Sequence, residues 1–512
     1  MKKKISLLVF VILILGMIYR IILTLGGNFL FNMDNARDMV DVREIVVLGK
    51  LRLTGPTSAI EGLYNGPAWY YLLAIPFIVT GGDPYGSIVG EIILWAIGGF
   101  FLLKLVSSYG KAAIIAVGSV WVASNYVVLT NLYAFNPNPV ILLTPLFIYS
   151  LKRYLETDRL FFSLACGFLA GLFFNFEMNF GIFMPFIIIF SLILSRHHQM
   201  IRTKNFLFGL GAFVMMLLPQ VLFDMRHQFI MTTSVLNYLD LQRASQVINP
   251  ILRSSFMAQK FYDSILPTFM NFKLLTQTLV ILFFFILFKY FKNAFWKKDL
   301  TILISLLFIF VPFFGYILIP TTVNSWHLGG VMAATILLLG FVLKKLFDSG
   351  FFGKLISVTL FLMVVLSSVL NIINFFTKDF GKVNLDPSSI KNEIAAIDYV
   401  YQKAEGQNFK VYTYLPSVYD YPYQYLFWWY GKKTYGYIPG EYAYSPNKPQ
   451  YISNKDKFEG KKDNFSGLIF LIKEPDRIRY RTAWENDFKD MEFISKEMVG
   501  PLEIEIRRES TN

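Results

Sequence analysis

Long apolar runs separated by short polar connections recur along the chain as far as Phe376. A helix that crosses a bilayer needs about 20 mostly apolar residues. The run at 66–80 is shorter and begins with Gly66-Pro67, so it predicts an interfacial or re-entrant helix. The longer runs predict about eleven transmembrane helices, near residues 5–25, 85–107, 111–131, 138–156, 159–176, 180–196, 204–223, 274–292, 299–319, 327–347 and 353–375.

The first apolar run could belong to a signal peptide, because three lysines precede it. We find no small-x-small cleavage site after it, and the apolar stretch continues past Arg20. We therefore interpret this run as a retained first transmembrane helix.

The distribution of Lys and Arg sets the topology, because cytoplasmic loops carry an excess of both. With the N-terminus inside and 66–80 left out of the count, the short outer connections 132–137, 177–179 and 320–326 contain no Lys or Arg. The C-terminus then lies outside. The inner connections hold Lys111, Lys152, Arg153, Arg159, Arg196, Arg202, Lys204, Lys289, Lys292, Lys297, Lys298, Lys344, Lys345 and Lys354.

Two long outer loops, 26–84 and 224–273, break this rule. Lys and Arg that lie outside, against the positive-inside rule, favour an anionic ligand at these loops. Long loops, however, also tolerate charge without a function. Both interpretations stay open. The cations of these loops are Arg37, Arg43, Lys50 and Arg52, then Arg226, Arg243, Arg253, Lys260 and Lys273.

Hydropathy falls after Phe376, which predicts a transmembrane domain over 1–376 and an extracytoplasmic domain over 377–512. Residues 385–404 have the apolar periodicity of a helix. Strand-like runs follow at 409–415, 423–430, 466–472 and 502–508. We expect a small α/β domain, and we assign it no nucleotide because it contains no glycine-rich phosphate-binding motif.

Composition supports a membrane protein: 55% of the residues are hydrophobic and only 16% are charged, against about a quarter in soluble domains. The formal charge of +13 comes from the membrane part, because acids and bases are nearly balanced after Leu385. Cations flanking helices explain it better than nucleic-acid binding does. The one cysteine, Cys166, excludes a disulfide framework and a cysteine-based metal site.

Polar and ionisable side chains collect at the outer ends of the predicted helices. Such groups are costly at membrane depth and by default indicate a site or an ion pathway. Structural alternatives exist: Asp34 could cap a surface helix over 35–49, and Glu177 could cap the helix after it. The candidates are Asp34, Arg37, Asp38, Glu91, Asn136, Asn138, Glu177, Arg226, His227 and His327.

A transferase on the outer side of a membrane finds no nucleotide sugars there, so its donor must be carried by the lipid. A polyprenyl-phosphate sugar is such a donor. Its transfer needs a carboxylate to take the proton of the acceptor hydroxyl. It also needs cations where charge develops on the departing phosphate. Asp34 and Arg37 in an outer loop fit both requirements.

The chain resembles the GT-C glycosyltransferases, in the protein-mannosyltransferase-like branch that includes the lipid A aminoarabinose transferase. The resemblance covers about residues 1–230. It is carried, in order, by "MDNARD" (33–38), "NGPAWYYLLAIPF" (65–77), "GGDPYGSIVGEIILWAIGGFFLLKL" (81–105), "NLYAFNPNP" (131–139) and "FNFEMNF" (174–180).

The resemblance implies that Asp34 takes the place of the family's essential first-loop acid and that 66–80 is a juxtamembrane element. The chain departs from many relatives at Asn65-Gly66-Pro67, where those relatives have a basic residue before two prolines. It also lacks the second acid that several relatives carry outside the third span. Some members use a divalent metal and others none, so the cofactor stays unknown.

We therefore expect a multi-pass plasma-membrane hexosyl- or pentosyltransferase that inverts the anomeric centre, with Asp34 as general base. The acceptor is a glycan, a lipid or a protein. The donor-phosphate candidates are Arg37, Arg226, His227 and His327, and the acceptor- or sugar-orienting candidates are Glu177, Asp38, Asn136, Asn138 and Glu91. The alternatives are a transporter or flippase of lipid-linked glycans, and a binding protein whose C-terminal aromatic residues hold glycans.

Overall fold

The computed structural model describes residues 2–245, 250–290, 299–319, 321–379, 385–453, 465–476 and 478–509. Lys292, Lys297 and Lys298, counted above among the inner cations, lie outside these ranges. The chain divides into two compact units. We call Met1–Ile21, Arg52–Tyr71 and Gly90–Phe375 the helical unit, and Ile22–Leu51, Leu72–Val89 and Phe376–Asn512 the sheet unit.

Each of the eleven apolar runs contains helix. The short run at 66–80 also forms a helix, α3 (Ala68–Thr80). Six helical segments of the described chain are long and apolar enough to cross a membrane, so the number of spans stays a prediction. The helices of the runs are α1 (Lys2–Thr24), α4 (Tyr85–Val106), α5 (Lys111–Ala123), α6 (Asn125–Leu129), α7 (Asn138–Thr157), α8 (Leu160–Phe176), α9 (Met178–Gly181), α10 (Met184–Leu194), α11 (Lys204–Arg226), α14 (Lys273–Tyr290), α16 (Leu300–Leu318), α17 (Gly329–Phe347) and α18 (Phe351–Asn374).

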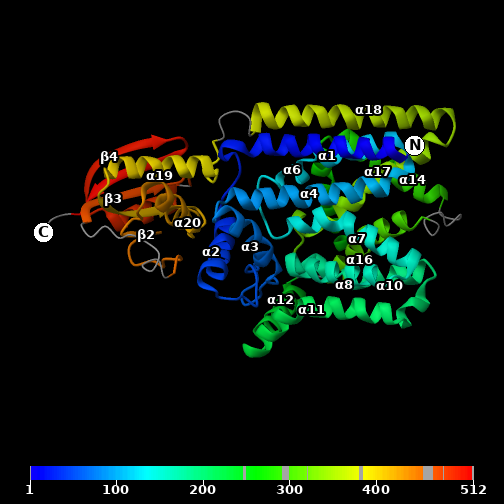
Figure 1. Cartoon of the computed structure of the whole chain (residues 1–512), viewed down its shortest axis with the longest axis horizontal. Helices are drawn as coiled ribbons and strands as arrows, with labels where there is room; N and C mark the ends of the chain where they lie inside the picture. Colours follow the sequence, from blue (N-terminus) through cyan, green and yellow to red (C-terminus); the bar gives the residue numbers. More distant parts are fainter. Residues whose placement is uncertain are drawn as a thin grey trace. The chain divides into compact units, whose positions relative to one another are not determined.

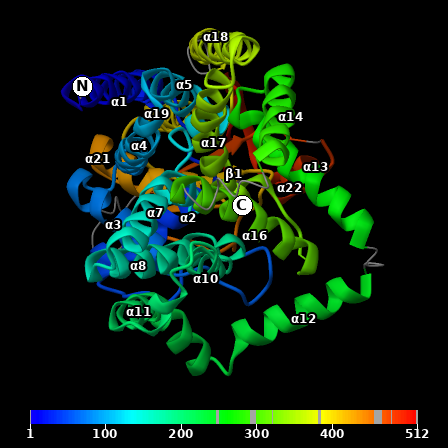
Figure 2. The ribbon, with the colours of Figure 1, turned by 90° about the vertical axis from the view of Figure 1, so that its right-hand side faces the viewer.

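Helix α17 forms the centre of the helical unit and packs against α5, α7, α16 and α18 (Figure 2). Most of its side chains are buried, as expected of a helix that is apolar on every side. Helices α8 and α11 pack along each other at close range, because Gly167 faces the backbone of Gly209 with no room for a Cβ. Small residues allow such close approach between membrane helices.

The loop 224–273, which the sequence predicts to be an outer one, is largely helical, as α12 (Ile230–Ser245) and α13 (Pro250–Thr268). A tight turn joins α11 to α12, with Gln228 and Phe229 both in the left-handed backbone region. Asp224 stabilises this turn by accepting hydrogen bonds from the Met231 amide at 2.7 Å and the Thr232 hydroxyl at 2.6 Å. Helix α13 packs against α16 and α17, so this part of the loop belongs to the bundle.

The sheet unit contains a five-stranded mixed sheet in the order β2-β1-β3-β5-β4. Strand β1 is parallel to β2 and β3, while β5 is antiparallel to β3 and β4. Helix α19 (Ile390–Ala404) covers the sheet (Figure 1). The strands are β1 (Asn408–Tyr414), β2 (Glu441–Ala443), β3 (Phe465–Lys473), β4 (Glu492–Val499) and β5 (Leu502–Arg508). A small α/β domain is confirmed.

The strand expected at 423–430 is wrong. This stretch forms helix α20 (Tyr421–Leu426) followed by a π-helical turn, Phe427–Gly431. Pro422 lies in the first turn of α20, a position that suits a helix start. The run is buried over consecutive residues rather than on one alternating face, so its high strand propensity is overridden by packing.

Buried carboxyl groups lie between α19 and the end of β3. Burial raises the pKa of Glu393 well above its usual value, and the carboxyls of Glu474 and Asp386 add to the rise. Burial also raises the pKa of Glu474 to about 7, although a hydrogen bond from Tyr423 opposes the rise. A Glu in an unfolded chain has a pKa of about 4.3, so folding favours the protonated forms. The stability that the protonated carboxyls contribute is therefore fully present below a pH of about 4.3, and the share of Glu474 is lost as the pH rises through about 7.

We predict that Glu393→Gln raises the thermal midpoint of the full chain at pH 8. The rise should be about 2–4 °C for each kcal/mol by which the substitution increases the free energy of unfolding. The gain should shrink at pH 5, because the wild-type carboxyl is then protonated and already neutral. Tryptophan fluorescence of the detergent-solubilised protein during heating measures both midpoints. Glu405→Gln, at an exposed helix end, is the matched control and should change neither midpoint. An equal gain at both pH values would contradict the prediction.

Candidate active site

The segment "DNARD" lies in helix α2 (Met33–Leu48) of the sheet unit. Asn32 is the N-cap of this helix, and its side-chain oxygen accepts hydrogen bonds from the amides of Asp34 and Asn35. The interpretation of Asp34 as the cap is therefore wrong. Asp34 occupies the first turn, where the helix dipole favours a negative charge. Its side chain is 30% exposed and accessible to a substrate.

Arg37 connects two carboxylates of α2. Its Nη1 lies 3.0 Å from Asp34 Oδ1, and its Nη2 lies 2.9 Å from Asp38 Oδ1. Asp38 is buried whereas Asp34 is partly open, so the guanidinium is fixed on one side and reachable on the other. The structure therefore brings together three of the predicted site residues.

The chain before α2 is held by the start of α19 within the sheet unit. The Phe31 amide donates to the Ser388 carbonyl at 2.8 Å, and the Ile390 amide donates to the Phe29 carbonyl at 3.1 Å. The Ser389 hydroxyl also donates to the Gly27 carbonyl at 3.2 Å. These bonds satisfy buried backbone groups and set the direction in which α2 begins.

The middle of α2 packs on α20 and its π-helical turn. Arg43 is fully buried, with its guanidinium 4.7 Å from the centre of the Trp428 ring, and it donates to the Ser453 carbonyl at 2.9 Å. The Ser453 hydroxyl donates to Glu44 at 2.7 Å. Arg43 therefore holds α2 in place by packing and hydrogen bonding, and the anionic-ligand interpretation of this outer-loop cation loses its support.

A second group of predicted residues lies buried in the helical unit. Glu177 is the N-cap of α9, and its carboxylate accepts a hydrogen bond from the Asn179 amide at 3.1 Å. Burial raises the pKa of Glu177 to about 7, opposed by that hydrogen bond. The Asn179 side chain lies 3.3 Å from His327 Nε2, and the Tyr316 hydroxyl donates to the Asn179 carbonyl at 2.9 Å. Glu177 thus caps a helix, as one of the alternatives held, and also joins a polar network.

The tautomer of His327 follows from its partners. The Asn324 amide donates to Nδ1 at 3.2 Å, so Nδ1 carries no proton. In the neutral ring the proton is then on Nε2. The atom that lies 3.3 Å from Nε2 is the Asn179 side-chain nitrogen, so a hydrogen bond there requires the Asn179 amide group to be turned so that its oxygen faces the ring. Sequence reasoning missed Asn179 and Tyr316. Asn179, two residues after Glu177, had a usable signal as a polar residue in a short outer connection, whereas Tyr316 lies inside an apolar run.

Asn136, Asn138 and Glu91 are also buried in the helical unit. The side-chain amide of Asn136 donates to the backbone carbonyl of Phe176, the residue before Glu177, at 2.6 Å. The side-chain amide of Asn138 donates to backbone carbonyls of the chain before α7. Glu91 lies beside Asn138. Asn136 therefore satisfies a backbone carbonyl at the end of α8, and Asn138 satisfies carbonyls in the turn before α7.

Arg226 and His227 are exposed at the end of α11, and within the described ranges no hydrogen bond or ion pair links them to Glu177 or His327. The His227 ring stacks on Phe223 at 4.0 Å, and its Nδ1 lies 2.8 Å from the Phe223 carbonyl. Arg253, an outer-loop cation, donates to the carbonyls of Tyr316 and Ile319 at the end of α16. It therefore caps a helix C-terminus, where a cation is favourable.

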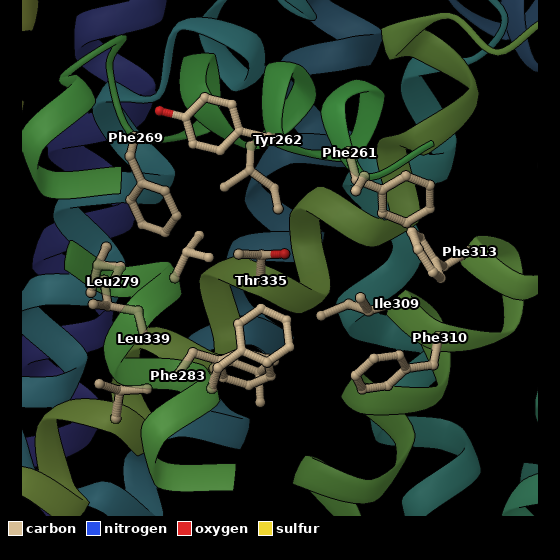
Figure 3. Close-up of a pocket in the computed structure, with 16 residues that line it drawn as sticks. Phe261, Tyr262, Phe269, Leu279, Phe283, Ile309, Phe310, Phe313, Thr335 and Leu339 are labelled. Atoms are coloured by element: carbon tan, nitrogen blue, oxygen red, sulfur yellow. The ribbon is translucent and has the colours of Figure 1, made fainter. Parts of the chain in front are cut away.

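An apolar cavity of about 380 Å³ lies in the helical unit between α13, α14, α16 and α17 (Figure 3). Phenylalanine and aliphatic side chains form nearly all of its wall, including Phe261, Phe283, Phe310 and Leu339. Its size falls in the range of ligand pockets, about 300–1,000 Å³. The lining offers no charge, so the cavity suits a hydrocarbon chain.

The acids of α2 do not fit a metal site, because Arg37 is paired with both Asp34 and Asp38. Within the described ranges, three carboxylates with metal-ligand spacing occur at Glu485, Glu503 and Glu505 of the sheet unit. Lys473 and Arg481 neutralise this group: the Lys473 ammonium lies 2.7 Å from Glu485 and 3.4 Å from Glu503, and Arg481 pairs with the same two acids. We derive no step through a metal.

Two comparisons with known proteins support the resemblance to the protein-mannosyltransferase and aminoarabinose-transferase branch of the GT-C glycosyltransferases. Residues 65–223 match the family model of the dolichyl-phosphate-mannose-protein mannosyltransferases. The structure is similar to that of ArnT from Cupriavidus metallidurans bound to undecaprenyl phosphate, with a TM-score of 0.61 over 97% of each chain at 10% identity. The apo state of the same ArnT gives 0.56, covering 99% of this chain and 98% of that one, also at 10% identity. No curated protein matches the sequence. The resemblance seen in the motifs is confirmed.

The departure at Gly66 has a structural reason. The Gly66 amide donates to the Asn175 carbonyl, and a Cβ on Gly66 would lie 1.9 Å from the Asn175 side-chain oxygen. The side-chain amide of Asn175 donates to the backbone carbonyls of Gly171 and Met216, both at 2.9 Å. These bonds fix the Asn175 side chain against α8 and α11. A side chain at position 66 is therefore excluded, which explains the glycine where many relatives have the first of two prolines; the basic residue of those relatives corresponds to Asn65.

We predict that Asn179→Ala and His327→Ala are coupled in stability by about 0.5–3 kcal/mol, because each removes the same contact. The double-mutant cycle is measured from the free energy of unfolding of the full chain in mixed micelles. Asn179→Ala with His197→Ala is the control cycle, because His197 contacts Ser195 beyond the far end of α10. That cycle should be additive within about 0.5 kcal/mol. Additivity in the first cycle would show that the network is absent.

Proposed function

We propose that the protein is a glycosyltransferase that moves a sugar from a polyprenyl-phosphate donor to an acceptor hydroxyl on the extracytoplasmic side of the plasma membrane. The observation that carries the proposal is the Asp34–Arg37–Asp38 arrangement at the start of α2 in a chain with the GT-C fold. The undecaprenyl phosphate bound to the similar ArnT structure supports a phosphorylated isoprenoid as the carrier.

In the proposed reaction Asp34 accepts the proton of the acceptor hydroxyl as its oxygen attacks the anomeric carbon. The bond from that carbon to the phosphate oxygen breaks, and the carrier leaves as polyprenyl phosphate. A phosphate leaves as a stable anion, so the reaction needs no general acid on the leaving side. One displacement inverts the anomeric centre.

Arg37 is proposed to bind the donor phosphate. It is a planar donor that suits bidentate contact with phosphate, and Asp38 fixes it from the buried side. Phosphate would compete with Asp34 for the Nη1 side of the guanidinium. Donor binding would then release the Asp34 carboxylate toward the acceptor, so that the base becomes available only when the donor is present.

Part of the isoprenoid chain is proposed to occupy the apolar cavity lined by α13, α14, α16 and α17. A flexible hydrocarbon fits a cavity whose wall is almost wholly aromatic and aliphatic. The buried polar residues of the helical unit, Glu177 and His327 above all, are proposed to orient the sugar or the acceptor. Arg226 and His227 are weaker candidates for phosphate, because both lie in an exposed turn.

We predict that Asp34→Asn lowers sugar transfer by about 10²–10⁴-fold, the usual contribution of a general base. Purified protein in nanodiscs is assayed by the release of polyprenyl phosphate and by product formation. Asp348→Asn, an exposed acid paired with Lys344, is the matched control and should keep wild-type rates. Full transfer by Asp34→Asn would remove the base assignment. A product with retained configuration would rule out the single displacement.

We predict that Leu339→Trp weakens binding of undecaprenyl phosphate by about tenfold, which corresponds to about 1.4 kcal/mol. The indole would fill the cavity that the chain needs. Leu366→Trp places the same side chain on an exposed face of α18 and should bind normally. Binding is measured by titration of the nanodisc-embedded protein. Equal affinity of both variants would show that the cavity does not hold the chain.

A further inference from the structure

Three tyrosine rings are stacked on the sheet unit around the start of α20. The rings of Tyr421 and Tyr451 lie 3.9 Å apart with an angle of 26° between their planes, and those of Tyr419 and Tyr421 lie 6.1 Å apart at 22°. We call Tyr419, Tyr421 and Tyr451 the tyrosine ladder. Tyr419 is 51% exposed, so the ladder ends in an open aromatic face.

The ladder is held by buried polar groups beneath it. The Gln424 side chain accepts a hydrogen bond from the Tyr451 amide at 2.6 Å and donates to Asp420 Oδ1 at 2.9 Å. Asp420 is fully buried, and its Oδ2 has no hydrogen-bond partner in the described structure. This framework fixes the rings in place rather than leaving them as mobile surface residues.

The turn that presents Tyr419 is strained. Val418 has a φ of 67°, which is a real outlier for a β-branched residue. Its side chain is exposed, so the strain is not repaid by burial of that side chain. Strained backbone clusters at active sites and ligand clamps, so the outlier beside Tyr419 supports a binding site there.

The ladder adjoins the helix that carries Asp34, within the same unit. Helix α2 packs against α20. Burial raises the pKa of Tyr421, Asp41 of α2 adds to the rise, and Arg37 opposes it. The hydroxyl of Tyr421 is therefore in the electrostatic reach of the same guanidinium that holds Asp34.

The charges around the ladder select the kind of ligand. Helix α2 carries four carboxylates, on Asp34, Asp38, Asp41 and Glu44, against the two guanidiniums of Arg37 and Arg43. Residues 415–431 contain one acid, Asp420, and no Lys or Arg. Of the α2 groups, the acids Asp34, Asp41 and Glu44 are partly exposed and outnumber the one partly exposed cation, Arg37, which disfavours an anionic polymer at this face. Carboxylates and tyrosine hydroxyls instead suit the hydroxyl groups of a neutral sugar.

We propose that the tyrosine ladder binds a sugar ring of a neutral glycan acceptor beside the Asp34 end of α2. One face of a pyranose consists of C–H groups, which pack on the negative face of an aromatic ring. The open face of Tyr419 takes this C–H face, and Tyr421 and Tyr451 give the platform its rigidity. The inference rests on the proposed transferase function only for naming the glycan as the acceptor; the binding itself is tested without turnover.

The experiment measures glycan binding to the full chain in nanodiscs, without donor, by saturation-transfer NMR titration. The probes are maltohexaose, cellohexaose, xylohexaose and chitohexaose, with hexagalacturonate as the anionic comparison. We expect at least one neutral oligosaccharide to bind. We expect hexagalacturonate to bind about tenfold more weakly or not at all, a difference of about 1.4 kcal/mol.

Variants of the ladder decide the site. Tyr419→Ala should weaken binding of the neutral oligosaccharide about tenfold, and Tyr419→Trp should keep it because the aromatic face remains. Tyr480→Ala removes a tyrosine that is 64% exposed elsewhere on the same unit and should bind as the wild type does. Absence of binding by every neutral probe, stronger binding of hexagalacturonate, or equal effects of Tyr419→Ala and Tyr480→Ala would each overturn the proposal.

The two proposals fail separately. Normal transfer by Asp34→Asn overturns the base assignment and leaves the glycan titration unaffected. Loss of the Tyr419 effect in the titration overturns the ladder and leaves the transfer assay unaffected.

Discussion

The hydrogen bonds between the chain before α2 and the start of α19 determine where Asp34 lies. Ser389 is 362 positions from Gly27, yet its hydroxyl donates to the Gly27 carbonyl. One backbone hydrogen bond on each side of Ser389 fixes Phe29 and Phe31. Asn32 then caps α2. The direction of α2 and the position of its first turn follow from this pairing. The C-terminal part of the chain is therefore a structural requirement for the acid-rich helix.

The same constraint explains why α2 carries more charge than a packed helix usually does. Arg43 faces the α20 side, where Trp428 and the Ser453 carbonyl replace its water, and Arg37 pairs with Asp38 at the buried edge of the helix. A buried polar group without such partners would cost about 1–3 kcal/mol. A chain ending near residue 376 would lose the partners of Arg43 and the pairing at Phe31 together. The C-terminal domain thus supports the transfer chemistry proposed for α2, whatever else it binds.

The sequence predicted the apolar helices and missed most long-range contacts, for physical reasons. An apolar run of membrane length has few alternatives to a helix, so every such run from 5–25 to 353–375 contains one. The run at 423–430 has the composition of a strand, and only burial on several faces makes it helical. Strand β4 has exposed residues along most of its length, so it lacks the apolar signal of β3. The pairing of residue 31 with residue 388 leaves no local pattern at all.

The candidate residues show the same difference between local sequence patterns and long-range contacts. Asp34, Arg37 and Asp38 were identifiable because acid and base recur at helical spacing in one outer loop. The roles of Glu177 and His327 were not, because Asn179 and Tyr316 link them through contacts between separate helices. Two of the predicted outer cations have structural roles instead. Arg253 caps the end of a helix. Arg43 packs on an aromatic ring.

These assignments also bear on the alternative of a transporter. Transporters commonly place interrupted helices at the membrane midplane, where the breaks bind the substrate. In the described ranges, one break lies at Ser124, in the second half of the run 111–131, and another at Ile182–Phe183, near the start of the run 180–196. Ser124 caps α6, and the amides of Ile182 and Phe183 donate to the carbonyls of Met178 and Phe180, so the backbone groups at the breaks already have protein partners. Fixed caps at the ends of helices make a rigid frame, and a rigid frame suits a reaction that requires aligned groups more than it suits a site that must open alternately to two sides.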